Sequence, residues 1–339
     1  MSAPASKPLH LDVKNLTVDF RTRDGVVKAL EGVDLELSLG DTLALVGESG
    51  SGKSVSAYAI MGILPDTATI SADRIMVGGV DLQSASKRTL RELRGYEIAM
   101  IFQNARAALN PIRPIGHQLM DVLHRHRKLS GKKARAAAVD ALAQVRIPDP
   151  ERRFSAYPFE LSGGMCQRVM IAIALACQPA VLIADEPTTG LDVTTQAAIM
   201  DLLADLAKTR KMATILITHD LALAKDTCDR LTVMHAGHIV ETGRASALFA
   251  APAHPYTAGL IAATPTGHSS LDSLTPIRGG LPDLRGELPP CRFIGRCDRR
   301  TDICATAPLP TLRLAGDHAV RCHHPELHGA ARPVDAEVA

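Results

Sequence analysis

The sequence predicts an α/β protein with a mainly parallel sheet and helices on both faces, and three observations carry this prediction. Residues 42–46, 181–184 and 213–218 are apolar runs of the kind that form strands buried on both faces. Helical segments separate these runs, and a glycine-rich loop joins the first run to a helix that starts near Lys53. A length of 339 residues and a hydrophobic content of 46% suit one large domain with a smaller appendage.

Two stretches before this core have the period of half-buried strands. Residues 11–20 and 33–37 alternate between polar and apolar side chains. Turn residues follow each stretch, with Asp24 and Gly25 after the first and residues 39–41 after the second. This pattern predicts antiparallel strands with one exposed face.

Helical periodicity replaces the strand pattern between Gln103 and Gln178, for example in residues 117–128 and 132–144. Prolines punctuate this stretch, so we predict an inserted helical subdomain at about residues 104–178. The apolar residues 169–184 are interrupted at Gln178, and each half is too short to cross roughly 30 Å of hydrocarbon. They predict a buried helix followed by a buried strand.

The composition argues against some classes of partner and compartment. A net charge of +2 and an aromatic content of 3% do not favour nucleic acid as a partner. Residues 1–11 lack the apolar core of a secretory signal, so we expect the chain to stay in the cytosol. Seven cysteines in that compartment argue against disulfide bonds.

The loop after residues 42–46 has the pattern Gly-x4-Gly-Lys-Ser. Its glycines let successive backbone N–H groups converge on the β- and γ-phosphates of a nucleotide, and the dipole of the following helix adds to this. Lys53 supplies a positive charge, and Ser54 can offer its hydroxyl to Mg²⁺. We therefore predict an ATP-binding loop. Its residues are Gly47, Glu48, Ser49, Gly50, Ser51, Gly52, Lys53 and Ser54.

Asp185 and Glu186 end the apolar run at residues 181–184. A carboxylate pair at that position is costly unless a cation or water occupies the site. Asp185 can hold the Mg²⁺ shell through water, and Glu186 can polarise the water that attacks the γ-phosphate. Together with the phosphate loop, this pair predicts ATP hydrolysis.

A second glycine-rich site lies directly before an apolar helix and consists of Ser162, Gly163 and Gly164. Its amides and hydroxyl can bind another anion, although Ser-Gly-Gly alone is commonly an N-cap with a flexible turn. One nucleotide needs only one complete phosphate loop, so the second site predicts a dimer that shares its nucleotides.

Residues 161–168 read Leu-Ser-Gly-Gly-Met-Cys-Gln-Arg, and with the loop upstream and Asp185 downstream they closely resemble the signature of ATP-binding cassette (ABC) proteins. The resemblance covers about residues 10–250. It implies a P-loop NTPase fold: an ABC nucleotide-binding domain at residues 8–250 with an antiparallel β subdomain and an inserted helical subdomain. Residues 251–339 would form a small, loop-rich C-terminal extension.

The resemblance also implies roles for further residues. Gln103 matches the glutamine that contacts Mg²⁺ and the attacking water and senses the membrane partner. His219 matches the histidine that contacts the γ-phosphate, and Asp192 belongs to the D-loop at residues 189–192. Phe20 fits the aromatic residue that stacks on adenine, where the family often has Tyr. The chain departs from the family at residues 104–106 and at Cys166, which puts the contact with the permease in doubt.

A single cassette without a membrane segment resembles the energising subunit of a bacterial importer. Residues 254–257 and four cysteines resemble the C-terminal extension of oligopeptide and dipeptide permease ATPases, and the whole chain resembles the D-type dipeptide-permease subunit. The cysteines are Cys291, Cys297, Cys304 and Cys322. The resemblance implies that they hold a [4Fe–4S] cluster. Zinc is less favoured because no cysteine pair has a spacing of two to four residues, and buried thiols without a ligand are the third reading.

The resemblance implies import of dipeptides or oligopeptides, with nickel complexes or glutathione as alternative substrates. A non-transport ABC ATPase acting on nucleic acid or ribosomes is the alternative from another class. The implied partners are a second ABC ATPase subunit in a heterodimer, two transmembrane permease subunits and an extracytoplasmic binding protein, and not nucleic acid. The implied location is the cytoplasmic face of the inner membrane, as a peripheral protein.

Overall fold

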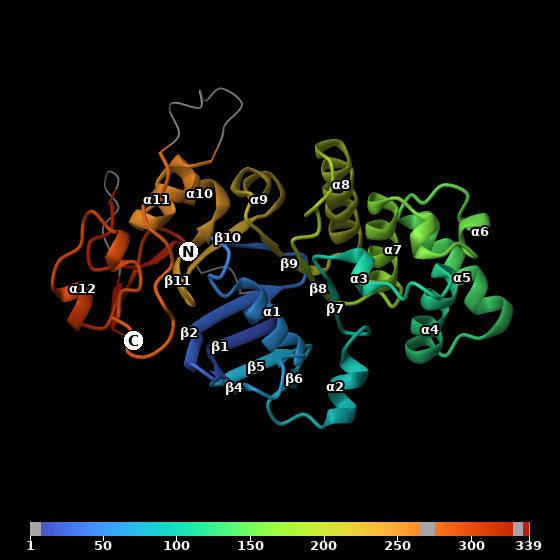
Figure 1. Ribbon diagram of the computed structural model, residues 1–339, viewed down its shortest axis with the longest axis horizontal. Helices are drawn as coiled ribbons and strands as arrows, with labels where there is room; N and C mark the ends of the chain where they lie inside the picture. The colour runs from blue at the N-terminus through green and yellow to red at the C-terminus, as the bar shows by residue number, and fades with distance from the viewer. Residues whose placement is uncertain (1–7, 265–274, 328–334, 339) are drawn as a thin grey trace, which may run out of the picture. The chain divides into compact units, whose positions relative to one another are not determined.

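The computed structural model describes residues 8–264, 275–327 and 335–338 (Figure 1). Within them the chain divides into two compact units. The first contains residues up to 11 together with residues 37–41 and 76–215, and the second contains residues 12–36, 42–75 and 216 onward. The sequence-based boundary at residue 250 falls inside the second unit. Among the described residues, no helix is both long and apolar enough to cross a membrane.

The second unit begins with most of a long hairpin, β1 (Leu9–Thr22) and β2 (Gly25–Ser38), where the sequence predicts antiparallel strands. Strand β4 (Ala68–Ser71) adds to β1 in antiparallel fashion. Leu11 and Val13 of β1 are fully buried, and so are Leu16 and Val18 after the exposed Asn15, because successive side chains of a strand point to opposite faces.

The second unit also contains the strand that leads into the phosphate loop. Strand β3 (Thr42–Val46) pairs in parallel with β10 (Arg230–His235), and Leu45 lies beside Thr232. Strand β10 pairs with β11 (His238–Arg244), and β11 with β13 (Ala319–Arg321). Strand β12 (Pro310–Arg313) then joins β13 to β14 (Asp335–Val338). The C-terminal residues therefore continue the sheet that holds the phosphate loop.

Short helices complete this unit. The sequence did not predict the strands β12, β13 and β14 that lie in the tail beside some of these helices. The helices are α1 (Lys53–Met61), α9 (Leu221–Thr227), α10 (Ala245–Ala250), α11 (Pro255–Ala262) and α12 (Ile303–Thr306). One apolar cluster joins Ala44 and Val46 of β3 with Tyr256, Phe293 and Cys304 of the tail. The tail thus shares its core with the nucleotide-binding strands.

The buried carboxylate of Glu241 binds the backbone of the segment that follows α10. Glu241, on β11, has 1% of its surface exposed. It accepts hydrogen bonds from the backbone N–H groups of Ala253 (2.7 Å) and His254 (2.9 Å), and it contacts Nε2 of His318 at 2.7 Å. Two separate segments of the tail therefore meet at one side chain of β11.

The first unit contains the predicted helical subdomain. Strands β7 (Ile98–Ile101) and β8 (Val181–Asp185) pair in parallel and are fully buried, as their apolar sequences predict. Strands β5 (Arg74–Val77) and β6 (Val80–Asp81) pair with each other, while β5 and β9 (Ala213–Thr218) cross the division between the units. The helices are α2 (Lys87–Leu93), α3 (Ala105–Ala108), α4 (Ile115–Arg127), α5 (Gly131–Gln144), α6 (Pro150–Arg153), α7 (Gly163–Leu175) and α8 (Val193–Arg210).

Candidate nucleotide-binding site

The phosphate loop joins β3 to α1 within the second unit, in the strand–loop–helix order that the sequence predicts. The Lys53 ammonium group lies inside the loop, with 5% of the residue exposed. It donates to the backbone oxygens of Gly47 and Glu48, both at 2.8 Å. This places a desolvated positive charge at the centre of a ring of backbone groups, and Ser54 follows it in the first turn of α1.

Glycines at two loop positions are required by the backbone. Gly47 has φ of 148°, and a Cβ atom there would lie 2.1 Å from the backbone oxygen of Met234. Gly52 has φ of 107°, and a Cβ atom there would lie 2.6 Å from a methyl carbon of Leu30. Any other residue would push the loop away from β10 or β2, so its shape depends on these glycines.

The predicted magnesium ligand Asp185 and the predicted catalytic residues Glu186 and Gln103 lie in the first unit. Asp185 ends β8 and is 2% exposed. Glu186 follows it with a backbone φ of 44°, a conformation that residues other than glycine rarely adopt. The Glu186 carboxylate accepts hydrogen bonds from Nε2 of Gln103 and from the Thr189 hydroxyl, both at 2.8 Å. The strained turn after the strand aims Glu186 at Gln103, so the structure brings these two predicted residues together.

The second glycine-rich site also lies in the first unit. Ser162 is the N-cap of α7, and its hydroxyl oxygen accepts a hydrogen bond from the Met165 N–H at 3.3 Å. A Cβ atom on Gly164 would lie 2.6 Å from Cγ2 of Thr195 on α8, so a larger residue would separate the two helix starts. The backbone N–H groups at the start of α7 are those that the predicted anion site would use.

The remaining predicted residues outside the phosphate loop are Asp192, His219 and Phe20. Asp192 caps α8 by accepting from the Thr195 N–H (2.9 Å) and hydroxyl (2.7 Å), and the hydroxyl bond is the main cause of its lowered pKa. His219 is exposed directly after β9. Phe20 is half-buried on β1 and pairs with Ala68.

The candidate residues thus fall into two sets. The second unit holds the phosphate loop, Phe20 and His219, whereas the first unit holds Gln103, Asp185, Glu186, Asp192 and the Ser162–Gly164 segment.

The four tail cysteines gather in the second unit, where Cys291, Cys297, Cys304 and Cys322 line the same small cavity. Burial raises the pKa of the Cys291 thiol to about 11 and that of Cys322 to about 12, and neighbouring cysteines contribute to both shifts. All seven cysteines are described, and none forms a disulfide bond. Within the described residues, however, no three His, Cys, Asp or Glu side chains are arranged to hold a metal ion. The types of residue suit a thiolate-bound cluster, while their arrangement is not that of a formed site.

Sequence reasoning missed two residues that contact the phosphate loop. The Tyr256 hydroxyl accepts a hydrogen bond from the Glu48 N–H at 2.9 Å, and the Arg296 guanidinium pairs with the Glu48 carboxylate at 2.5 and 2.8 Å. The available signal was their position inside the motifs at residues 254–257 and 291–297. Nothing in the sequence alone indicated that these motifs reach back to the loop.

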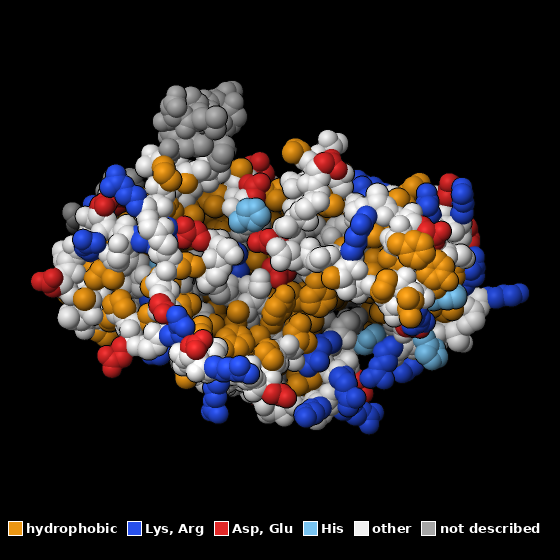
Figure 2. All heavy atoms as spheres, in the orientation of Figure 1, with side chains coloured by type: hydrophobic (Ala, Val, Ile, Leu, Met, Phe, Trp, Pro, Cys, Tyr) orange, Lys and Arg blue, Asp and Glu red, His pale blue; other side chains and the backbone are white. Residues whose placement is uncertain are grey.

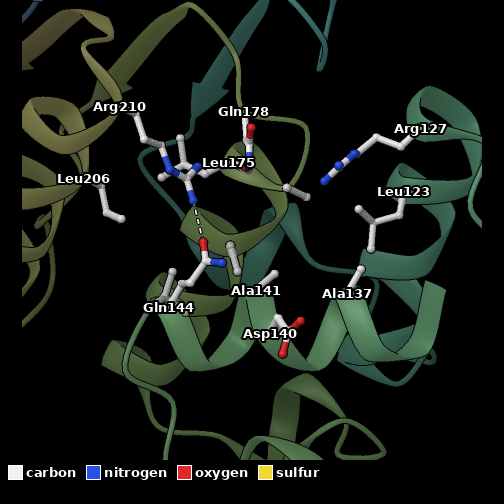
Figure 3. Close-up of a pocket in the computed structure, with 13 residues that line it drawn as sticks. Leu123, Arg127, Ala137, Asp140, Ala141, Gln144, Leu175, Gln178, Leu206 and Arg210 are labelled. Atoms are coloured by element: carbon white, nitrogen blue, oxygen red, sulfur yellow. Dashed lines mark hydrogen bonds between the residues drawn. The ribbon is translucent and has the colours of Figure 1, made fainter. Parts of the chain in front are cut away.

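A cavity of about 120 Å³ lies between α4, α5, α7 and α8 and contains none of the predicted site residues. Figure 3 shows Arg210 and Arg127 on opposite sides of it, with Gln144 hydrogen-bonded to Arg210 at 2.5 Å. Arg210 also donates to the backbone oxygen of Leu175 at 3.0 Å. These bonds join the end of α8 to the ends of α5 and α7, which is a structural role.

Known proteins resemble the chain in both its fold and its motifs. The family model described as ABC transporter matches residues 30–189. A solved structure described as a dimeric post-hydrolysis state of the ATP-binding cassette MJ0796, bound to ADP and Pi, has a TM-score of 0.62 and 26% identity, covering 69% of this chain and 98% of that chain. The fold and sequence define an ABC transporter ATPase, an enzyme that hydrolyses ATP with Mg²⁺, and the predicted P-loop NTPase fold of the cassette is confirmed.

The C-terminal residues show to which group of ABC transporter proteins the chain belongs. A second family model, described as the oligopeptide/dipeptide transporter C-terminal region, matches residues 240–304. The dipeptide transport ATP-binding protein DppD of Bacillus subtilis (strain 168) is 45% identical over 314 residues, covering 92% of this chain and 93% of the relative. DppD of Escherichia coli (strain K12) is 43% identical over 323 residues, covering 95% and 98%. The chain belongs to the oligopeptide/dipeptide family of ABC transporter ATP-binding proteins.

Proposed function

We propose that this protein is the ATP-hydrolysing subunit of an importer for dipeptides or short oligopeptides. The observation that carries the proposal is the identity of 45% and 43% over more than nine-tenths of the chain to proteins named for dipeptide transport. The match of residues 240–304 to the oligopeptide/dipeptide C-terminal region supports it independently of the cassette.

In the proposed mechanism, the phosphate loop binds ATP through its backbone amides and Lys53. Ser54 and Asp185 would hold Mg²⁺, which would neutralise charge on the phosphates. Glu186 polarises the attacking water. Gln103 orients that water and would also contact Mg²⁺. His219 contacts the γ-phosphate, Phe20 stacks on adenine, and Asp192 lies at the cassette interface. Ser162, Gly163 and Gly164 complete the nucleotide site of a second cassette, so that ATP binding closes a dimer and hydrolysis reopens it.

We propose that the permease contact uses the exposed apolar side chains Phe102, Ile112 and Phe159 of the first unit, together with the half-buried Tyr157. Ile112 is 81% exposed and Phe159 74% exposed, and the Phe159 ring stacks on Tyr157. Phe102 directly precedes Gln103. Figure 2 shows hydrophobic side chains gathered over the region where Figure 1 places α5 and α7. Exposed apolar side chains that gather on one surface are typical of a binding site for another protein.

The proposed assembly contains this chain, a related second cassette, two permease subunits and an extracytoplasmic binding protein, with the cassettes peripheral on the cytoplasmic face of the inner membrane. The test is co-expression with the candidate permease subunits, purification from solubilised membranes and reconstitution in vesicles. Uptake of a labelled dipeptide that requires ATP would support the proposal. Uptake of nickel chelates or glutathione in place of dipeptides would overturn the substrate, and failure to co-purify with a permease would overturn the importer.

We also propose that the four tail cysteines hold a [4Fe–4S] cluster, because they converge on one buried cavity of a loop-rich segment. The measurement is iron and acid-labile sulfide per chain after anaerobic purification. About four of each would support the cluster. Zinc in place of iron, or four titratable thiols without metal, would overturn it.

A further inference from the structure

A seven-residue segment between two cysteines places two arginines inside the nucleotide-binding unit. In residues 291–297, which read Cys-Arg-Phe-Ile-Gly-Arg-Cys, the side chains of Arg292 and Arg296 are 1% and 5% exposed. Arg292 donates to the backbone oxygen of Ala236 at 2.5 Å and pairs with Glu31. Both arginines therefore contact residues that lie far away in the sequence, and Arg296 contacts the phosphate loop.

Arg296 uses its whole guanidinium group. Nη1 and Nη2 donate to the two carboxylate oxygens of Glu48, at 2.5 and 2.8 Å, and Nε donates to the backbone oxygen of Arg278 at 2.8 Å. Such a bidentate pair fixes direction as well as distance. Glu48 is the residue that follows the first glycine of the phosphate loop, so this pair sets where the loop begins its turn.

Tyr256 holds the same loop residue by its backbone. Its hydroxyl accepts the Glu48 N–H at 2.9 Å, and its fully buried ring packs against His235 (centroids 4.6 Å apart) and Phe293 (5.3 Å). A third contact from the tail lies two residues further on, because a Cβ atom on Gly50 would be 3.1 Å from Cδ1 of Leu281. The C-terminal extension thus holds both the amide and the side chain of Glu48 and closely approaches Gly50.

We propose that Arg296 and Tyr256 are positioning residues for ATP binding: from the C-terminal extension, they fix Glu48 so that the following loop amides converge on the phosphates. Neither residue has a part in the chemical step. Their loss therefore weakens ATP binding and leaves the rate at saturating ATP nearly unchanged. The proposal rests on the ATPase activity of the chain and does not depend on what is transported.

The test uses the full-length purified chain, with Kd measured by fluorescence titration with a labelled ATP analogue, and KM and kcat by phosphate release. Arg296→Gln and Glu48→Gln are each expected to raise Kd and KM about tenfold, which is the size of one lost charge-assisted contact. The double variant is expected to be no weaker than either single variant, because both remove the same pair. Tyr256→Phe removes only a hydroxyl group and is expected to raise Kd several-fold in a folded chain.

The matched control is Arg285→Gln. Arg285 forms a similar two-point pair with Asp283 inside the same extension, with Nε–Oδ1 and Nη2–Oδ2 both at 2.8 Å. Its loss should leave Kd for ATP unchanged. An unchanged Kd in Arg296→Gln, additive effects in the double variant, or a fall in kcat equal to the rise in KM would overturn the proposal. If Arg296→Gln does not fold, the variants Arg296→Lys and Tyr256→Phe test the proposal by the same comparison of Kd, KM and kcat.

Discussion

The position of the Glu186 carboxylate depends on the backbone conformation of the residue as well as on its hydrogen bonds. Its φ of 44° places it off the end of β8, where Gln103 and Thr189 hold the same carboxylate oxygen. The general base that we propose must point at its water, and two donors to one oxygen fix the direction of the carboxylate.

The variant Glu186→Gln should retain ATP binding and lose hydrolysis. The amide has the size of the carboxylate but cannot accept a proton, so we expect kcat to fall by about 10²–10⁴-fold. The measurement is phosphate release beside equilibrium ATP binding. Hydrolysis at the unaltered rate would exclude Glu186 as the base.

Gly47 should not tolerate alanine, because the added Cβ atom would lie 2.1 Å from a backbone oxygen that cannot move aside alone. We expect Gly47→Ala to lower the melting temperature and to abolish ATP binding. Gly40→Ala is the control, since Gly40 also has positive φ, 84°, but nothing lies within 4 Å of its Cβ position. Equal effects of the two variants would show that backbone strain alone is responsible.

Among the elements, the strands of the nucleotide-binding core were predictable because their signals are local. Residues 43–46 and 181–184 are apolar throughout, and a phosphate loop follows the first run while a carboxylate pair follows the second. The hairpin β1–β2 and the helices α4 and α5 also follow from periodicity. The tail strand β13 could not be found in this way, because its three residues become a strand only by pairing with β11. For the same reason, Arg296 could not be assigned to the phosphate loop from the sequence.

Helix α8 is joined to α5 and α7 by Arg210, which donates to Gln144 and to the Leu175 backbone oxygen (Figure 3). Arg210→Ala removes two charge-assisted bonds and should lower the free energy of unfolding by about 1–3 kcal/mol. Arg88→Ala is the control: it removes an exposed pair with Glu92, which solvent screens, and should leave the stability nearly unchanged. Thermal denaturation of both variants checks this, and equal shifts would contradict it.

At the scale of the whole molecule, the C-terminal residues are part of the nucleotide-binding unit. A chain ending at residue 250 would expose Val46, Leu231 and Val233, which pack in one cluster with Tyr256 and Phe293. We expect that truncated chain to aggregate on expression. A chain ending at residue 327, which keeps this cluster, should remain folded. Gel filtration and ATP binding distinguish the two, and a monomeric, ATP-binding chain ending at residue 250 would contradict the prediction.

The stability of the protein should fall in mild acid because of histidines buried in a neutral form. Burial, and next the charge of Arg296, lower the pKa of His235 to about 3, and burial lowers that of His254 to about 4. Unfolded histidine binds a proton below a pKa of about 6.5. Between that value and the folded pKa the unfolded state holds more protons, so stability is fully present above about pH 6.5 and is lost as the pH falls toward 3.

The variant His235→Phe keeps an aromatic ring between Tyr256 and Phe293 but cannot be protonated. Its melting temperature should depend less on pH between about 4.5 and 6.5 than that of the original chain. Differential scanning fluorimetry over this range provides the comparison. Parallel curves would show that His235 does not contribute to acid sensitivity.

The hydrogen bond that Ser162 makes as the N-cap of α7 explains why serine suits this position better than aspartate. A hydroxyl group has one hydrogen to donate and two lone pairs, and the Met165 N–H engages a lone pair of Ser162. The cap therefore orients the oxygen without using its proton, which can be given to a phosphate oxygen. Aspartate caps helices equally well but has only acceptors and a negative charge, so it would repel the anion that the helix start attracts. Serine can stabilise the helix and bind phosphate with the same atom.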